Sequence, residues 1–93
     1  MARTLETLTI GTPVYCGETR VGEIRGLYTE GASRAVEWLV ARWDQRNEDV
    51  AVPATEVESV SERGVELMHH DPKIYAELTT FSEARYPTIR RLA

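Results

Sequence analysis

The stretch from Ala35 to Asp44, AVEWLVARWD, constrains the fold most, because it is the longest run of β-favouring residues in the chain. Successive side chains of a strand point to opposite faces of its sheet. Trp38 and Val40 are therefore expected on one face, and the other face takes Leu39 and Trp43. A strand that is apolar on both faces has to be covered on both. We predict that this strand is central, with the core on one side and a second layer on the other.

The bulk composition is that of a single soluble domain. The chain has 93 residues, of which 42% are hydrophobic and 28% are charged. Its net charge of −4 disfavours general binding to nucleic acid or to anionic membranes, because both need clustered Lys and Arg. Cys16 is the only cysteine, so no intramolecular disulfide can form. Without a signal peptide or an apolar run of membrane-spanning length, the chain is expected to be cytoplasmic.

Short β-favouring segments separated by turns make up most of the chain before residue 70. Val21, Ile24 and Leu27 do not alternate strictly, and a bulge near Gly22 or Gly26 would bring them to one face. The segment 54–60 is ambiguous, because its valines have the spacing of a short helical turn. Besides 35–44, the expected strands are 14–16, 21–28, 49–53 and 65–69.

The C-terminal part is predicted to begin with a helix. Asp71 can cap free amides, and Pro72 fits the first helical position. Ile74, Leu78 and Phe81 then recur at i, i+4 and i+7, which makes one apolar stripe on a helix ending near Glu83 or Ala84. The remaining stretch, 85–93, has no obvious partner in the sequence. We expect it to fray or to dock on a neighbour.

Closely spaced antiparallel strands in so short a chain favour a small barrel, since closure removes exposed edges. The predicted fold is therefore mainly β: a small antiparallel β-barrel of five to six strands with a C-terminal helix. The predicted organisation is an N-terminal lead (1–9), a barrel-like domain (10–70), and a C-terminal helix and tail (71–93).

The order of these elements resembles a PRC-barrel domain, over roughly residues 10 to 70. The matching motifs are Gly11-Thr12-Pro13-Val14-Tyr15, Gly17, Arg20-Val21-Gly22-Glu23-Ile24, Trp38-Leu39-Val40, Val50-Ala51-Val52-Pro53, Val57-Glu58-Ser59-Val60 and Val65-Glu66-Leu67. The family includes the barrels of the photosynthetic reaction-centre H subunit and of a small-subunit ribosome maturation factor, and stand-alone versions. The resemblance implies a small interaction or assembly module with no shared catalytic residues. We expect neither the membrane helix of the first nor the RNA-associated domain of the second, so neither specific function is carried over to this chain.

Residues with chemical potential are few. His69-His70-Asp71 is the one cluster of metal-ligand types, but neighbouring strand residues point to opposite faces, so a strand end followed by a helix cap is the preferred interpretation. Cys16 has no neighbouring base in the sequence and is expected to be a buried thiol. Glu56, Glu58 and Glu62 are expected to form a solvated acidic face, which could still dock a basic partner. We predict no catalytic residue, no metal site and no cofactor.

The two tryptophans lead to the functional hypothesis. Five positions apart on a strand, they take opposite faces, so one is expected in the core and the other at an interface or under the C-terminal helix. The hypothesis is a non-enzymatic PRC-barrel-like interaction module, whose partner is either a second copy of itself, in a homodimer, or another protein. The alternatives are an RNA- or ribosome-associated factor using Arg85, Arg90 and Arg91, and a small-molecule or metal-binding barrel. The candidate interface residues are Trp38, Trp43, Ile74, Leu78, Phe81 and Tyr86.

Overall fold

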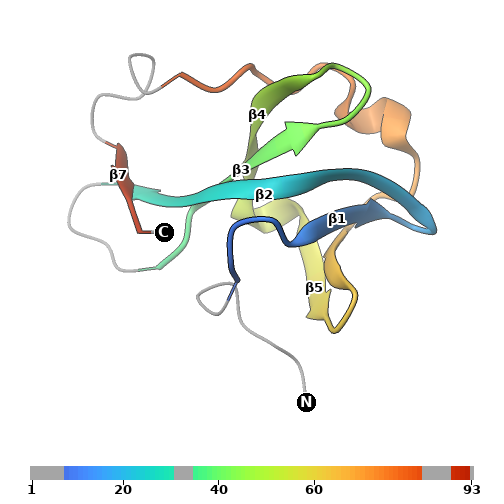
Figure 1. Ribbon diagram of the computed structural model, residues 1–93, viewed down its shortest axis with the longest axis horizontal. Helices are drawn as coiled ribbons and strands as arrows, with labels where there is room; N and C mark the ends of the chain where they lie inside the picture. The colour runs from blue at the N-terminus through green and yellow to red at the C-terminus, as the bar shows by residue number, and fades with distance from the viewer. Residues whose placement is uncertain (1–7, 31–34, 83–88, 93) are drawn as a thin grey trace.

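The computed structural model describes residues 8–30, 35–82 and 89–92, and in this part the protein is mainly β (Figure 1). In this described part, two short 3-10 helices, η2 (Ala54–Glu56) and η3 (Pro72–Tyr75), lie between strands. The ambiguous segment 54–60 therefore contains both a helical turn and a strand. The strands are β1 (Pro13–Cys16), β2 (Thr19–Glu30), β3 (Trp38–Trp43), β4 (Glu48–Pro53), β5 (Val57–Ser61), β6 (Gly64–Leu67) and β7 (Ile89–Arg91).

The long strand β2 organises the sheet, because it pairs with β1, β3 and β7 (Figure 1). Its pairing register shifts once opposite β1, where Val21 is the extra residue, and once opposite β3, where Arg25 is the extra residue. These two irregularities lie beside Gly22 and Gly26, so the expected bulge is confirmed. They turn Val21, Ile24 and Leu27 into the same core.

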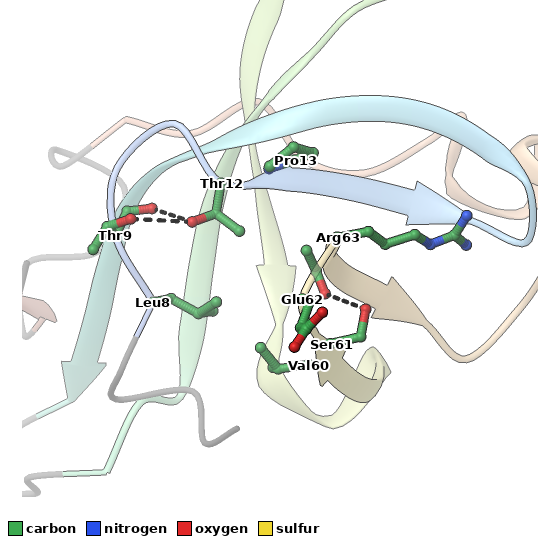
Figure 2. A pocket seen from close by; sticks show the side chains of 9 residues that line it. Leu8, Thr9, Thr12, Pro13, Val60, Ser61, Glu62 and Arg63 are labelled. Atoms are coloured by element: carbon green, nitrogen blue, oxygen red, sulfur yellow. Dashed lines mark hydrogen bonds between the residues drawn. The ribbon is translucent and has the colours of Figure 1, made fainter. Parts of the chain in front are cut away.

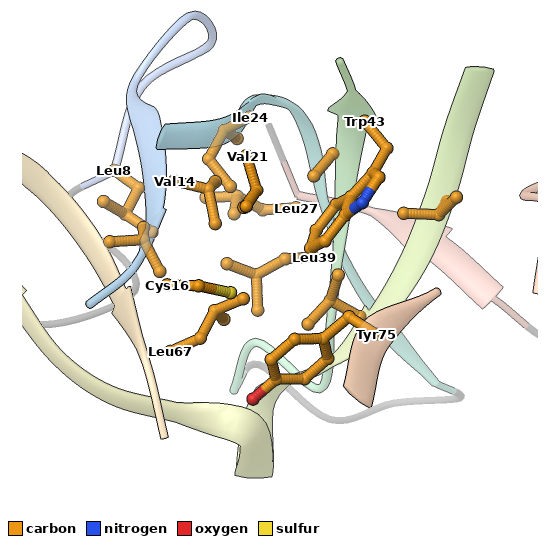
Figure 3. Packing of buried hydrophobic residues seen from close by; sticks show 14 of the residues in the cluster. Leu8, Val14, Cys16, Val21, Ile24, Leu27, Leu39, Trp43, Leu67 and Tyr75 are labelled. Atoms are coloured by element: carbon orange, nitrogen blue, oxygen red, sulfur yellow. The ribbon is translucent and has the colours of Figure 1, made fainter. Parts of the chain in front are cut away.

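That core lies on one side of the sheet (Figure 3). Val50 and Val52 of β4 point into it, as their alternation predicts, and Trp43 packs against Tyr75 with 6.0 Å between ring centroids. The buried cluster consists of Leu8, Val14, Cys16, Val21, Ile24, Leu27, Val36, Leu39, Ala41, Trp43, Val50, Val52, Val60, Val65, Leu67 and Tyr75.

The sheet departs from the predicted antiparallel barrel in two respects. Its main path runs β4-β3-β2-β1-β6-β5, and no pairing among the described residues joins β4 to β5, so the sheet is not closed. The pair β1–β6 is parallel, with Val14 opposite Val65. A parallel pair needs a long connection, and the chain between Cys16 and Gly64 supplies one.

The prediction of a C-terminal helix is wrong for the described residues. Asp71 does cap η3, accepting a hydrogen bond from the Lys73 amide at 3.0 Å, but helical structure ends at Tyr75. The chain then becomes extended, and Thr80 forms a β-bridge with Val50. Pairing with the β4 edge satisfies backbone groups that a helix would have satisfied internally, and the β-branched threonines at 79 and 80 favour the extended form.

The tail has a partner that the sequence did not indicate. Ile89–Arg91 forms β7, which is antiparallel to residues Tyr28–Glu30 of β2. The expectation that residues 85–93 lack a companion stretch is therefore wrong for 89–91. Since Tyr28–Glu30 lies beyond the part of β2 that β1 covers, β7 occupies an otherwise open length of that edge.

Candidate functional site

The two faces of β3 are covered differently, as its sequence predicts. Leu39, Ala41 and Trp43 are buried in the core. Val40 is also buried, at 3% exposure, but it lies on the opposite face and is not part of the core cluster. Trp38 shares that outer face and is only half-buried. Trp43 is thus the core tryptophan, and Trp38 is the outer one.

The outer face is covered in part by residues 78–82, which we call the strap. The strap adds to the edge of β4, because the Ala51 amide donates to the Thr79 carbonyl (3.0 Å) and the Phe81 amide donates to the Asp49 carbonyl (2.8 Å). The Phe81 ring reaches Tyr28 of β2, with 4.9 Å between centroids. An extended segment therefore provides the second layer expected from a helix.

Arg46, in the β3–β4 turn, fastens the strap to the sheet. Its guanidinium donates to the Leu78 carbonyl and to Thr80 Oγ1 (3.0 Å), while Glu48 pairs with it at 2.6 Å. The Thr80 hydroxyl in turn donates to the other Glu48 oxygen at 3.2 Å. Charged hydrogen bonds of this kind hold a segment more firmly than neutral ones.

Beside the strap, the outer face opens into a groove of about 320 Å³. Its floor and walls come from the central strands, from η3 and from the strap. Leu78 is half-buried, whereas Ile74 is 55% exposed. We call this the Trp38 groove; its lining residues are Trp38, Ala51, Pro53, Ile74, Glu77, Leu78 and Thr79.

The groove is suited to an apolar protein side chain. Glu77 is the only charged residue of its lining, and the indole N–H of Trp38 donates to Glu30 at 3.2 Å. Tryptophan is enriched at the energetic centres of protein interfaces, and here the half-buried Trp38 lies beside branched aliphatic side chains. The open shape offers no enclosed chamber of the kind that buries most of a small ligand.

Three of the six predicted interface residues meet in this groove: Trp38, Ile74 and Leu78. Trp43 is not an interface residue, since it is 2% exposed and belongs to the core. Phe81 packs on Tyr28 within the chain, and Tyr86 lies outside the described residues.

The roles of Pro53 and Tyr75 were not predicted from the sequence. Pro53 ends β4 as predicted, and in addition lines the groove opposite Trp38, its cross-strand partner. Tyr75 is 2% exposed, and its hydroxyl accepts a hydrogen bond from the His69 amide at 3.1 Å. Because the helix stops after one turn, Tyr75 enters the core while Ile74 faces solvent. No local pattern in the sequence indicates this arrangement, because it depends on the pairing of the strap with β4.

The two histidines lie beyond β6, which ends at Leu67 rather than at the predicted His69, so strand alternation does not apply to them. His69 Nε2 lies 3.9 Å from Glu56, and His70 Nε2 lies 3.9 Å from Glu58, so each faces a different carboxylate. In the described residues no group of three or more His, Cys, Asp or Glu side chains is arranged to hold a metal ion. One pair joins η2, and the other joins β5, to the chain after β6.

Cys16 is buried, as expected, at 1% exposure. Burial, and to a lesser degree the charge of Asp71, raises the pKa of the Cys16 thiol to about 11. A thiol that stays protonated at neutral pH is a poor nucleophile.

Of the predicted basic tail, Arg91 is engaged with its own chain, and Arg85 lies outside the described residues. The Arg91 guanidinium lies 5.9 Å from the centre of the Tyr28 ring and donates to the Arg25 carbonyl at 3.0 Å. This arrangement places Arg91 beside β2 and the strap rather than in an extended cationic arm.

Comparisons with protein-family models, with curated proteins and with solved structures find no match for this chain. Within residues 8–30, 35–82 and 89–92, no helix has the length and apolar character needed to cross a membrane.

Proposed function

We propose that this protein is a non-enzymatic, cytoplasmic interaction module of PRC-barrel type that forms a homodimer through the Trp38 groove. The observation that carries the proposal is the exposure of Ile74, 55%, at the rim of an apolar groove built on Trp38. Because the protruding Ile74 side chain and the groove lie in the same patch, each copy can insert its Ile74 into the groove of the other. Such a patch is self-complementary, as a two-fold interface requires.

Charge favours a second copy as the occupant. Lys73 and Glu77 lie on either side of Ile74 in the sequence, carry opposite charges and are both exposed. Neither forms an ion pair with another described residue. A two-fold axis near Ile74 would place Lys73 of each copy opposite Glu77 of its partner, so the same rotation that seats the apolar knobs also pairs the charges.

The order of the elements supports the PRC-barrel part of the proposal. The hairpin β1–β2, the central strand β3, β4 ending at Pro53, and the pair β5–β6 follow one another as in the sequence resemblance. The core lies on one side of the sheet, which suits a module that uses the outer face of the sheet for binding.

The association state of matched variants tests the proposal. Sedimentation velocity at micromolar concentration should show a dimer for the native chain and a monomer for Ile74→Glu, because burying two new carboxylates at a two-fold seam is costly. Ile10→Glu is the control, since Ile10 is similarly exposed (48%) but lies outside the groove. It should leave the dimer intact.

A charge exchange tests the two-fold arrangement itself. Lys73→Glu should weaken the dimer, because it sets two negative charges opposite each other, and adding Glu77→Lys should restore it. A native chain that remains monomeric at these concentrations would contradict the proposal, as would equal dissociation by Ile10→Glu and Ile74→Glu.

A further inference from the structure

A second hollow, of about 220 Å³, lies on another part of the molecule (Figure 2). It is formed between the segment that leads into β1 and the β5–β6 hairpin, so it shares no residue with the Trp38 groove. Its lining residues are Leu8, Thr9, Thr12, Pro13, Val60, Ser61, Glu62, Arg63 and Gly64.

The inner wall of this hollow is apolar. Leu8 and Val60 are 7% and 6% exposed, and both belong to the core cluster. Pro13 adds ring carbons beside them. At about 30 Å³ per water-sized group, the volume accommodates roughly seven such groups. That is enough for an alkyl stem of four carbons with a terminal head group.

The hydroxyl groups of the hollow already donate hydrogen bonds within the protein. Thr12 Oγ1 donates to the Thr9 carbonyl at 2.8 Å, which leaves the Thr9 hydroxyl to donate across 3.3 Å to Thr12 Oγ1. Ser61 Oγ donates to the Gly64 carbonyl at 3.4 Å. The oxygens of these side chains still have free lone pairs, so the hollow offers acceptors to a ligand.

The charge that remains in the hollow is negative. Arg63 contributes to the lining, but its side chain extends away toward the end of β1 (Figure 2), where it donates to the Gly17 carbonyl and to Glu66 and lies 4.1 Å from the Tyr15 ring centre. Glu62 is exposed and has no ion-pair partner among the described residues. An apolar wall, acceptor oxygens and one uncompensated carboxylate together favour an alkyl chain that ends in a cation.

We propose that this hollow binds the side chain of a lysine carried by a partner protein. The aliphatic stem packs on Leu8 and Val60, and the ammonium group donates hydrogen bonds to the Glu62 carboxylate and to the hydroxyl oxygens. Glu58, on the same hairpin, adds negative charge beyond the hollow and attracts a basic segment rather than an isolated amine. The proposal is independent of dimer formation through the Trp38 groove.

Titration of the full-length, isotope-labelled protein with three blocked pentapeptides tests the proposal. The probe is acetyl-Gly-Gly-Lys-Gly-Gly-amide, and its counterparts carry acetyllysine or norleucine in place of lysine. The lysine peptide should shift amide resonances of residues 8–13 and 60–64. The two counterparts should bind about tenfold more weakly, because they lack the charged donor.

Matched variants test whether Glu62 supplies the carboxylate that binds the ammonium group. Glu62→Gln should weaken the lysine peptide about tenfold, whereas Asp44→Asn removes the same charge at an exposed position outside both the hollow and the groove and should leave binding unchanged. Added salt should weaken the interaction. Equal binding of the three peptides, insensitivity to Glu62→Gln, or shifts confined to other residues would overturn the proposal. Free butylamine binding as tightly as the lysine peptide would overturn the choice of a protein partner.

Discussion

Removing the Trp43 side chain should destabilise the protein by about 3–5 kcal/mol. Trp43 is only 2% exposed and contacts Tyr75. A buried aromatic of this size removes about 150–250 Å² from water, which at about 25 cal/mol/Å² corresponds to about 4–6 kcal/mol. An extended chain, used as the unfolded reference, overstates the area buried on folding, so the expected loss of stability is the lower range of about 3–5 kcal/mol. At about 0.05–0.15 kcal/mol per residue, the whole domain has only about 5–14 kcal/mol of stability.

Trp38→Ala should cost less, about 1–2 kcal/mol, because its side chain borders an open groove that water can fill instead of leaving a closed cavity. Urea unfolding followed by circular dichroism measures both values. The measurements use an Ile74→Glu background, so that association does not add to stability. Trp43→Phe, which retains a ring near Tyr75, gives a folded reference if Trp43→Ala is too unstable to measure. A loss of stability for Trp38→Ala that equals or exceeds the loss for Trp43→Ala would refute this assignment of the two faces.

Three further predictions follow from particular contacts. Gly64→Ala should destabilise the protein by about 2 kcal/mol or more in urea unfolding, because Gly64 has φ +141° and a Cβ there would overlap the Pro13 carbonyl. The thiol of Cys16, whose pKa burial raises from 9.0 to about 11, should react slowly with iodoacetamide at pH 8 and faster as the pH approaches 11. The stability that this neutral thiol contributes is complete below its unfolded pKa and is lost as the pH rises through the folded pKa. Arg46→Met should cost about 1–3 kcal/mol and speed hydrogen exchange at the Phe81 amide, because the strap loses its charged hydrogen bonds; unchanged exchange would show that the strap is held by other contacts.

The candidate site was predictable in part. Alternation along β3 separated Trp38 from Trp43, since strand geometry fixes the parity of neighbouring side chains whatever their surroundings. Ile74 and Leu78 were assigned to the right surface for an incorrect reason, because a helical stripe was expected and one turn of 3-10 helix followed by the strap was found. Glu62 was assigned from the sequence to an acidic face that could dock a basic partner, but the hollow beside it had no sequence signal. It joins residues more than 45 positions apart.

The short-range features follow from local sequence alone. The glycines beside the β2 bulges, the cap at Asp71, the end of β4 at Pro53 and the two faces of β3 depend on covalent geometry and on neighbours within a few residues. The strap, β7 and the parallel β1–β6 pair depend instead on long-range packing. Each of these satisfies backbone groups at the edge of a distant strand, and the sequence of the segment does not encode which edge is available. The stretch from Ala35 to Asp44 required a second cover on its outer face, and long-range pairing decided that an extended segment would supply part of that cover and leave Trp38 at a groove.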